Sequence, residues 1–215
     1  MRFKRAVGIV IALVGQLLIR PLTRGLEADD VCGHVVKWIP AAFLVAYAKL
    51  VEDDGVESFG VRWDGVGPFL KRVGTGLAVM MGANVVLAPL HERIGTEDLM
   101  AGMAEYRDTS LLTRLFVALT AGVTEEILYR GYALERLEDE TDSRLVAAAG
   151  SVLAFVVAHK SDQWGWGSLA LIAQPATIVT LLYVRSRDLL AVIAVHALND
   201  AIGLLTLERT LDEES

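Results

Sequence analysis

Three ionisable side chains, Glu125, Glu126 and Arg130, lie close together in the segment TEEILYR at residues 124–130. The segment follows an apolar run from Leu111 to Val123, which predicts a membrane-embedded helix. A charged side chain at the centre of a bilayer costs about 2.5–3.5 kcal/mol on insertion scales, so we expect these groups to point at partners inside a helix bundle. Residues four apart share a helix face, which predicts an ion pair between Glu126 and Arg130.

Two downstream histidines are candidate partners for the glutamates. His159 ends the apolar segment FVVAH that begins at Phe155, and His196 begins the segment HALND that ends at Asp200. On helices, Phe155 shares a face with His159, and His196 shares a face with Asp200. Packing these helices against the first one is predicted to gather Glu125 and both histidines around one polar pocket.

Such a pocket suits hydrolysis. A carboxylate that a helix bundle partly desolvates becomes a useful general base, so Glu125, helped by His159, is predicted to take a proton from water. His196, with Asn199 and Asp200, can then support the oxyanion that develops on the attacked carbonyl. These stretches place no serine or cysteine at helical spacing from a histidine, which disfavours a covalent nucleophile.

The same residues leave a metal alternative open. Two histidines and a glutamate can bind zinc with water in the fourth position, and Glu125, His159 and His196 would be the ligands. The histidines lie on separate stretches without the HExxH spacing that identifies a zinc site in a sequence. We therefore expect no cofactor, with zinc as the alternative.

Composition predicts an all-α, polytopic transmembrane helix bundle. The 215 residues are 53% hydrophobic, and the mean hydropathy is +0.45. The apolar residues fall into continuous runs of about 15–22, close to the length of about 20 that spans a bilayer as a helix. About seven spans are predicted, with the three motifs on inner helices, at residues 6–19, 31–51, 69–90, 111–132, 144–159, 168–184 and 189–207.

We divide this single integral domain into N-terminal transmembrane helices and polar loops (1–110), a core that carries the motifs (111–207) and an acidic tail (208–215). Loop lysines and arginines number ten on the side of the N-terminus and seven on the other, which favours a cytoplasmic N-terminus in the cell membrane. The net charge of −7 argues against nucleic acid as a partner. Cys32 is the sole cysteine, so no intrachain disulfide can form.

At these motifs the chain resembles the CPBP (CAAX protease and bacteriocin-processing) family of intramembrane endopeptidases, the Rce1-like or Abi group. The family pattern EExxxR, FxxxH and HxxxN/D is matched here by Glu125-Glu126-x-x-x-Arg130, Phe155-x-x-x-His159 and His196-x-x-x-Asp200. The resemblance covers about Leu111 to Leu205.

The resemblance implies an intramembrane endopeptidase that acts on a membrane protein or lipidated peptide, with prenylated CAAX-type proteins as one candidate substrate. It implies that Glu125 and His159 activate water, that His196 and Asp200 form the oxyanion site, and that Glu126 and Arg130 organise the site. An ionised Asp200 would oppose an oxyanion, so Asn199 is an alternative donor.

Two other classes of function use the same bundle. A membrane scaffold or bacteriocin-immunity-type protein would bind a partner without catalysis and would tolerate alanine at Glu125 or His159. A proton-coupled transporter would also use buried Glu and His, but the chain has no visible inverted repeat or pair of broken helices.

Overall fold

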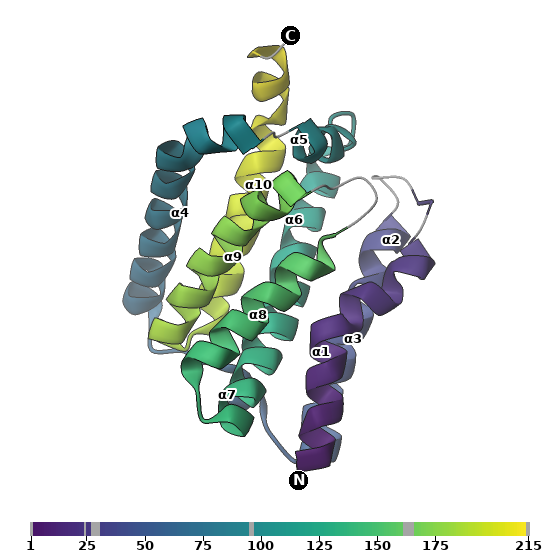
Figure 1. The fold of residues 1–215 in the computed structure, drawn as a ribbon, viewed down its shortest axis with the longest axis vertical. Helices are drawn as coiled ribbons and strands as arrows, with labels where there is room; N and C mark the ends of the chain where they lie inside the picture. The colour runs from purple at the N-terminus through teal and green to yellow at the C-terminus, as the bar shows by residue number, and fades with distance from the viewer. Residues whose placement is uncertain (1, 24, 27–30, 95–96, 161–165, 214–215) are drawn as a thin grey trace.

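The structure is a computed structural model that describes residues 2–23, 25–26, 31–94, 97–160 and 166–213. Within these ranges the ordered elements are helices, and no strand is present. Most helices run along the long axis of the molecule, with the N-terminus at the bottom and the C-terminus at the top of Figure 1. The predicted all-α bundle is confirmed.

Two continuous stretches and three long helices build most of the bundle. The long helices are α1 (Arg2–Thr23), α4 (Val66–Ile94) and α10 (Leu189–Glu213). In the first stretch, α6 (Leu111–Glu126) continues through the π-helix η3 (Ile127–Leu134) into α7 (Glu135–Thr141). The chain then returns through α8 (Arg144–Ala158), and α9 (Trp166–Ser186) follows. The second continuous stretch is formed by α3 (Trp38–Tyr47) and the π-helix η1 (Ala48–Glu52), which follows it directly. Three short helices complete the fold: α2 (Val31–Val36), the 3-10 helix η2 (Val56–Phe59) and α5 (Glu97–Ala104).

Five helical stretches among the described residues are long and apolar enough to cross a membrane: Phe3–Thr23, Val31–Glu52, Val66–Ile94, Gly167–Ser186 and Leu189–Thr206. The predicted spans at 111–132 and 144–159 are not among them. The first carries the charged motif, and α8, the helix of the second, has only 15 residues. The count of seven spans therefore stays a prediction.

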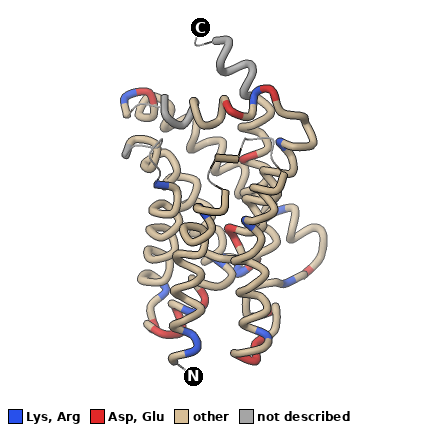
Figure 2. Tube along the Cα trace, turned by 90° about the vertical axis from the view of Figure 1, so that its right-hand side faces the viewer, with Lys and Arg blue, Asp and Glu red and all other residues tan. Residues whose placement is uncertain are grey.

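Figure 2 shows the charged positions mostly toward the two ends of the bundle, with long uncharged stretches of helix between them. A few charged positions lie at mid-height, inside the bundle. This distribution is what a bilayer requires, because charged side chains facing lipid are costly whereas charged side chains at the ends reach water.

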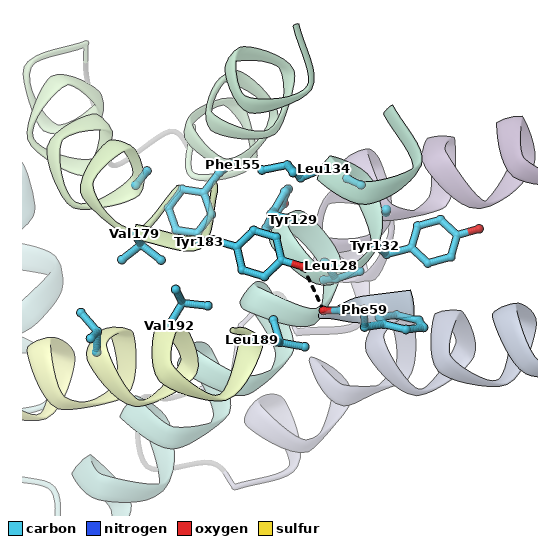
Figure 3. Packing of buried hydrophobic residues seen from close by; sticks show 14 of the residues in the cluster. Phe59, Leu128, Tyr129, Tyr132, Leu134, Phe155, Val179, Tyr183, Leu189 and Val192 are labelled. Atoms are coloured by element: carbon cyan, nitrogen blue, oxygen red, sulfur yellow. Dashed lines mark hydrogen bonds between the residues drawn. The ribbon is translucent and has the colours of Figure 1, made fainter. Parts of the chain in front are cut away.

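The core is rich in aromatic side chains. Tyr129, Tyr132 and Tyr183 are fully buried, and they pack with Leu128 and Phe59 (Figure 3). The hydroxyl of Tyr183 donates a hydrogen bond to the Phe59 carbonyl oxygen at 3.1 Å, so this buried polar group is satisfied. The contact ties α9 to η2.

A close approach at a glycine sets the position of α10 against α6, and a proline lies where α4 bends. A Cβ atom on Gly122 of α6 would lie 2.8 Å from the Ala197 Cβ and 2.9 Å from the Ala197 backbone nitrogen in α10. Only glycine allows this approach, which lies one turn from Glu125 and beside His196. Helix α4 bends near its upper end (Figure 1), where Pro89 lies inside the helix, and it continues to Ile94.

Candidate active site

Side-chain caps and one buried hydrogen bond place the two helices that carry the first two motifs. Ser110 and Ser143 cap the N-termini of α6 and α8 by accepting from the Thr113 and Val146 backbone N–H groups. In the middle of α8, the buried Ser151 hydroxyl donates to the Tyr129 carbonyl oxygen in η3 at 2.8 Å. These bonds hold α8 against η3, with its C-terminal end beside the charged motif.

The predicted pair of Glu126 and Arg130 is present and fully buried. The Arg130 Nη1 donates to Glu126 Oε1 at 2.7 Å, and neither side chain has exposed surface. The rest of the Arg130 guanidinium donates to α9, to the Ala176 carbonyl oxygen at 2.9 Å and to Thr180 Oγ1 at 3.2 Å. It also lies 4.7 Å from the centroid of the Phe155 ring in α8. One arginine thus joins three helices.

His196 connects this pair to α10. Its Nδ1 lies 2.7 Å from Glu126 Oε1, the oxygen that Arg130 also contacts. Its Nε2 lies 3.4 Å from Asp200 Oδ2, as the four-residue spacing predicts. Asn199 donates to the other Asp200 oxygen at 3.2 Å, so the two residues of the last motif contact each other.

Glu125 lies near the Nε2 atoms of both imidazoles. Its Oε2 lies 3.8 Å from His159 Nε2 and 4.0 Å from His196 Nε2. His159 is the C-cap residue of α8, and its Nδ1 lies 2.8 Å from the Phe155 carbonyl oxygen. A carbonyl oxygen only accepts hydrogen bonds, so Nδ1 donates to it, and Nε2 is the ring nitrogen directed toward Glu125.

Exposure separates the site residues into two groups. The side chains of Glu126 and Arg130 are 0% exposed, whereas those of Glu125, His196 and His159 are 10%, 12% and 25% exposed. The first group has no exposed side-chain surface, and its hydrogen bonds go to neighbouring side chains and to the backbone of α9. The second group faces a cavity, where it can meet water and substrate.

The cavity has a volume of about 810 Å³ and reaches the site from the upper half of the bundle. Met80, Met81 and Met103 contribute apolar, adaptable surface to its wall. Among the described residues, three side chains that line the cavity have a buried polar atom without a hydrogen-bond partner. These atoms are Gln16 Nε2, Gln174 Oε1 and Glu126 Oε2. A polar ligand that enters the cavity would find unused donors and acceptors there.

The structure brings all the predicted site residues together, and Glu125, Glu126, Arg130, Phe155, His159, His196, Asn199 and Asp200 all line this cavity. The described residues include no group of three or more His, Cys, Asp or Glu side chains placed as ligands of a metal ion would be. The zinc alternative stays a prediction, which a chelation experiment would test.

Sequence reasoning missed three features of the site. It treated residues 127–134 as α-helix, but they form a π-helix, a form that often occurs at functional sites. It also missed Thr180 as a partner of Arg130 and Arg20 as a partner of the end of α8. Arg20 carried a signal, because a cation at the end of an apolar span needs either water or a buried partner.

Comparison with known proteins gives a match to one family. The type II CAAX prenyl endopeptidase Rce1-like family matches residues 107–202, which include all three motifs. Neither the comparison with curated proteins nor the comparison with solved structures returned a match. The match supports membership of the CPBP family, as the three motifs predicted, and the five apolar helices support a multi-pass membrane protein.

Proposed function

We propose that the protein hydrolyses a peptide bond of a membrane-associated substrate with a water molecule that Glu125 and His159 activate. One observation carries the proposal: a single carboxylate oxygen, Glu125 Oε2, is faced by the Nε2 atoms of both His159 and His196, at 3.8 and 4.0 Å. Both separations exceed a direct hydrogen bond, and we propose that all three atoms contact the same water.

The proton transfers follow from the hydrogen bonds around the site. Glu125 takes a proton from the water as the oxygen attacks the carbonyl carbon, and the lone pair on His159 Nε2 orients the same water. When the tetrahedral intermediate collapses, the C–N bond breaks and Glu125 returns the proton to the leaving amine. The water oxygen thus ends in the new carboxyl group, and one of its protons ends on the new amine.

His196 is the proposed oxyanion donor. Its Nδ1 donates to Glu126, so its Nε2 can donate to an oxyanion only when the ring is doubly protonated. Carboxylates at both ends of the ring, Glu126 and Asp200, favour that positively charged form. Asp200 then acts on His196, and Asn199 donates a hydrogen bond to Asp200.

The proposed substrate is a membrane protein or a lipidated peptide, including prenylated CAAX-type sequences as the family name indicates. The cavity supports this proposal through its size, its methionines and its unused amide groups, which suit an apolar peptide with polar backbone atoms. The expected surroundings are the lipid bilayer of the cell membrane.

The test is peptide cleavage in proteoliposomes by wild type and by Glu125→Gln, each with and without a zinc chelator. The substitution keeps the shape and removes the base, so cleavage should fall at least about 10²-fold. We expect wild-type cleavage to survive chelation. Loss on chelation would favour the zinc site at Glu125, His159 and His196, and equal cleavage by both proteins would contradict the assignment and favour a membrane scaffold.

A further inference from the structure

The C-terminal end of α8 holds the catalytic candidate His159 and is anchored from outside its own helix. The last carbonyl groups of an α-helix have no partner within the helix. At the end of α8, the Phe155 carbonyl oxygen receives His159 Nδ1 at 2.8 Å. The carbonyl oxygens of Ala158 and Lys160, on either side of His159, both receive the guanidinium of Arg20.

Arg20 comes from a distant part of the chain. It lies near the C-terminal end of α1, outside the family match at residues 107–202, and α1 packs against α8. Its Nη1 donates to the Lys160 oxygen at 2.5 Å, and its Nη2 donates to the Ala158 oxygen. The same arginine lines the cavity that Glu125 and His159 face.

These contacts hold His159 at two points. The Phe155 carbonyl fixes the orientation of the ring, and the guanidinium fixes the backbone that carries it. Arginine suits this task because its planar fork bonds two acceptors at once, and a cation at a helix C-terminus is also favoured by the helix dipole. The separation between His159 Nε2 and Glu125 depends on both constraints.

We propose that Arg20 is a positioning residue that holds His159 in register with Glu125. The proposal rests on the proposed function, since it gives His159 a catalytic task. It makes α1 part of the active site: a helix that lacks the family motifs sets the geometry of one catalytic group.

The kinetic test compares Arg20→Gln, Arg20→Lys and the control Arg5→Gln in proteoliposomes. Arg5 lies on the same helix and pairs with Asp139 at the opposite end of the bundle, at 2.9 Å. Misplacing a catalytic group by about 1 Å can cost about 10²-fold, so Arg20→Gln should lower kcat about 10- to 100-fold. KM should stay within about twofold of wild type, because substrate binding is retained. Arg20→Lys keeps the charge but loses the planar guanidinium, so its kcat should lie between those of Arg20→Gln and wild type. The kcat of Arg5→Gln should equal that of wild type.

A second measurement does not depend on activity. In protein labelled with ¹⁵N-histidine, the His159 ring signals, assigned through His159→Gln, should move in Arg20→Gln and stay in place in Arg5→Gln. If no peptide is cleaved, the proposed function fails while this readout still tests the contact.

Wild-type kcat in Arg20→Gln, a raised KM with unchanged kcat, or unmoved His159 signals would each overturn the proposal. A raised KM would make Arg20 a substrate contact instead. If Arg20→Gln does not fold, Arg20→Lys decides: lower kcat with shifted His159 signals supports the proposal, and wild-type values of both overturn it.

Discussion

At the base of the bundle, the end formed by residues 52–65, 135–144 and 185–188, buried charges meet one another directly. Arg136 is 2% exposed. It donates to Glu52 Oε2 at 3.1 Å, to Asp54 at 3.0 Å and to the Ser58 hydroxyl at 3.0 Å. Tyr132 donates to the remaining Glu52 oxygen at 2.7 Å. Both oxygens of this buried carboxylate are therefore satisfied.

At the cavity, buried charges are only partly satisfied. The Glu126 side chain is 0% exposed and that of Glu52 is 3% exposed, but Glu126 Oε2 has no hydrogen-bond partner among the described residues. Glu125 meets its two histidines only at 3.8 and 4.0 Å. Unsatisfied polar groups in a low-dielectric interior cost stability, and they interact strongly with whatever enters. The comparison indicates that the base stabilises the fold, whereas the cavity end keeps its polar groups available for chemistry.

The largest effect should come from Arg130→Met. It removes the guanidinium from the fully buried Glu126 and leaves His196 Nδ1 as the partner of that carboxylate, and breaking a buried pair costs about 3–5 kcal/mol of the free energy of unfolding. Cleavage should also be lost, because Arg130 holds Glu126 and through it His196. Denaturant unfolding in detergent and the cleavage assay measure the two effects.

The matched control for that prediction is the double variant Glu126→Gln with Arg130→Met. It removes both charges, so most of the stability should return while cleavage stays absent. Cleavage at the wild-type rate by Arg130→Met alone would show that the buried pair has no part in the site.

A smaller effect is expected for Arg136→Met at the base. Glu52 keeps the Tyr132 hydroxyl, so the loss should be about 3 kcal/mol, the lower limit for a broken buried pair. At a temperature where the variant is folded, kcat should equal that of wild type. A fall in kcat as large as that of Arg130→Met would break the comparison between the two ends.

The smallest effect concerns Asp64, a partly exposed residue at the base. A hydrogen bond from Arg72, reinforced by the charges of Arg72 and Arg62, lowers the pKa of Asp64 from 3.8 to about 2. A carboxyl whose pKa is lowered by folding stabilises the protein above its unfolded pKa, and this contribution is lost as the pH falls toward the folded pKa. Asp64→Asn should thus lower the melting temperature slightly at pH 7. The difference from wild type should shrink below pH 3.8 and disappear near pH 2. A difference of constant size across this range would contradict the assignment.

The sequence by itself determined the contacts within each helix. The pairs Glu126–Arg130, Phe155–His159 and His196–Asp200 all meet in the structure, because a spacing of four residues brings side chains to one helix face whatever surrounds the helix. The apolar runs likewise determined the all-helical membrane fold, since only hydrogen-bonded helices or closed barrels satisfy the backbone in lipid.

Only the tertiary structure decided how the helices meet. It gave the adjacent glutamates different surroundings, with Glu126 fully buried against Arg130 and Glu125 partly exposed beside His159, and it placed Arg20 on the end of α8. These contacts depend on approaches such as that of Gly122 to Ala197, which join residues far apart in the chain. Helical periodicity specifies a face but not its neighbour, because the neighbour is chosen by the packing of the whole bundle.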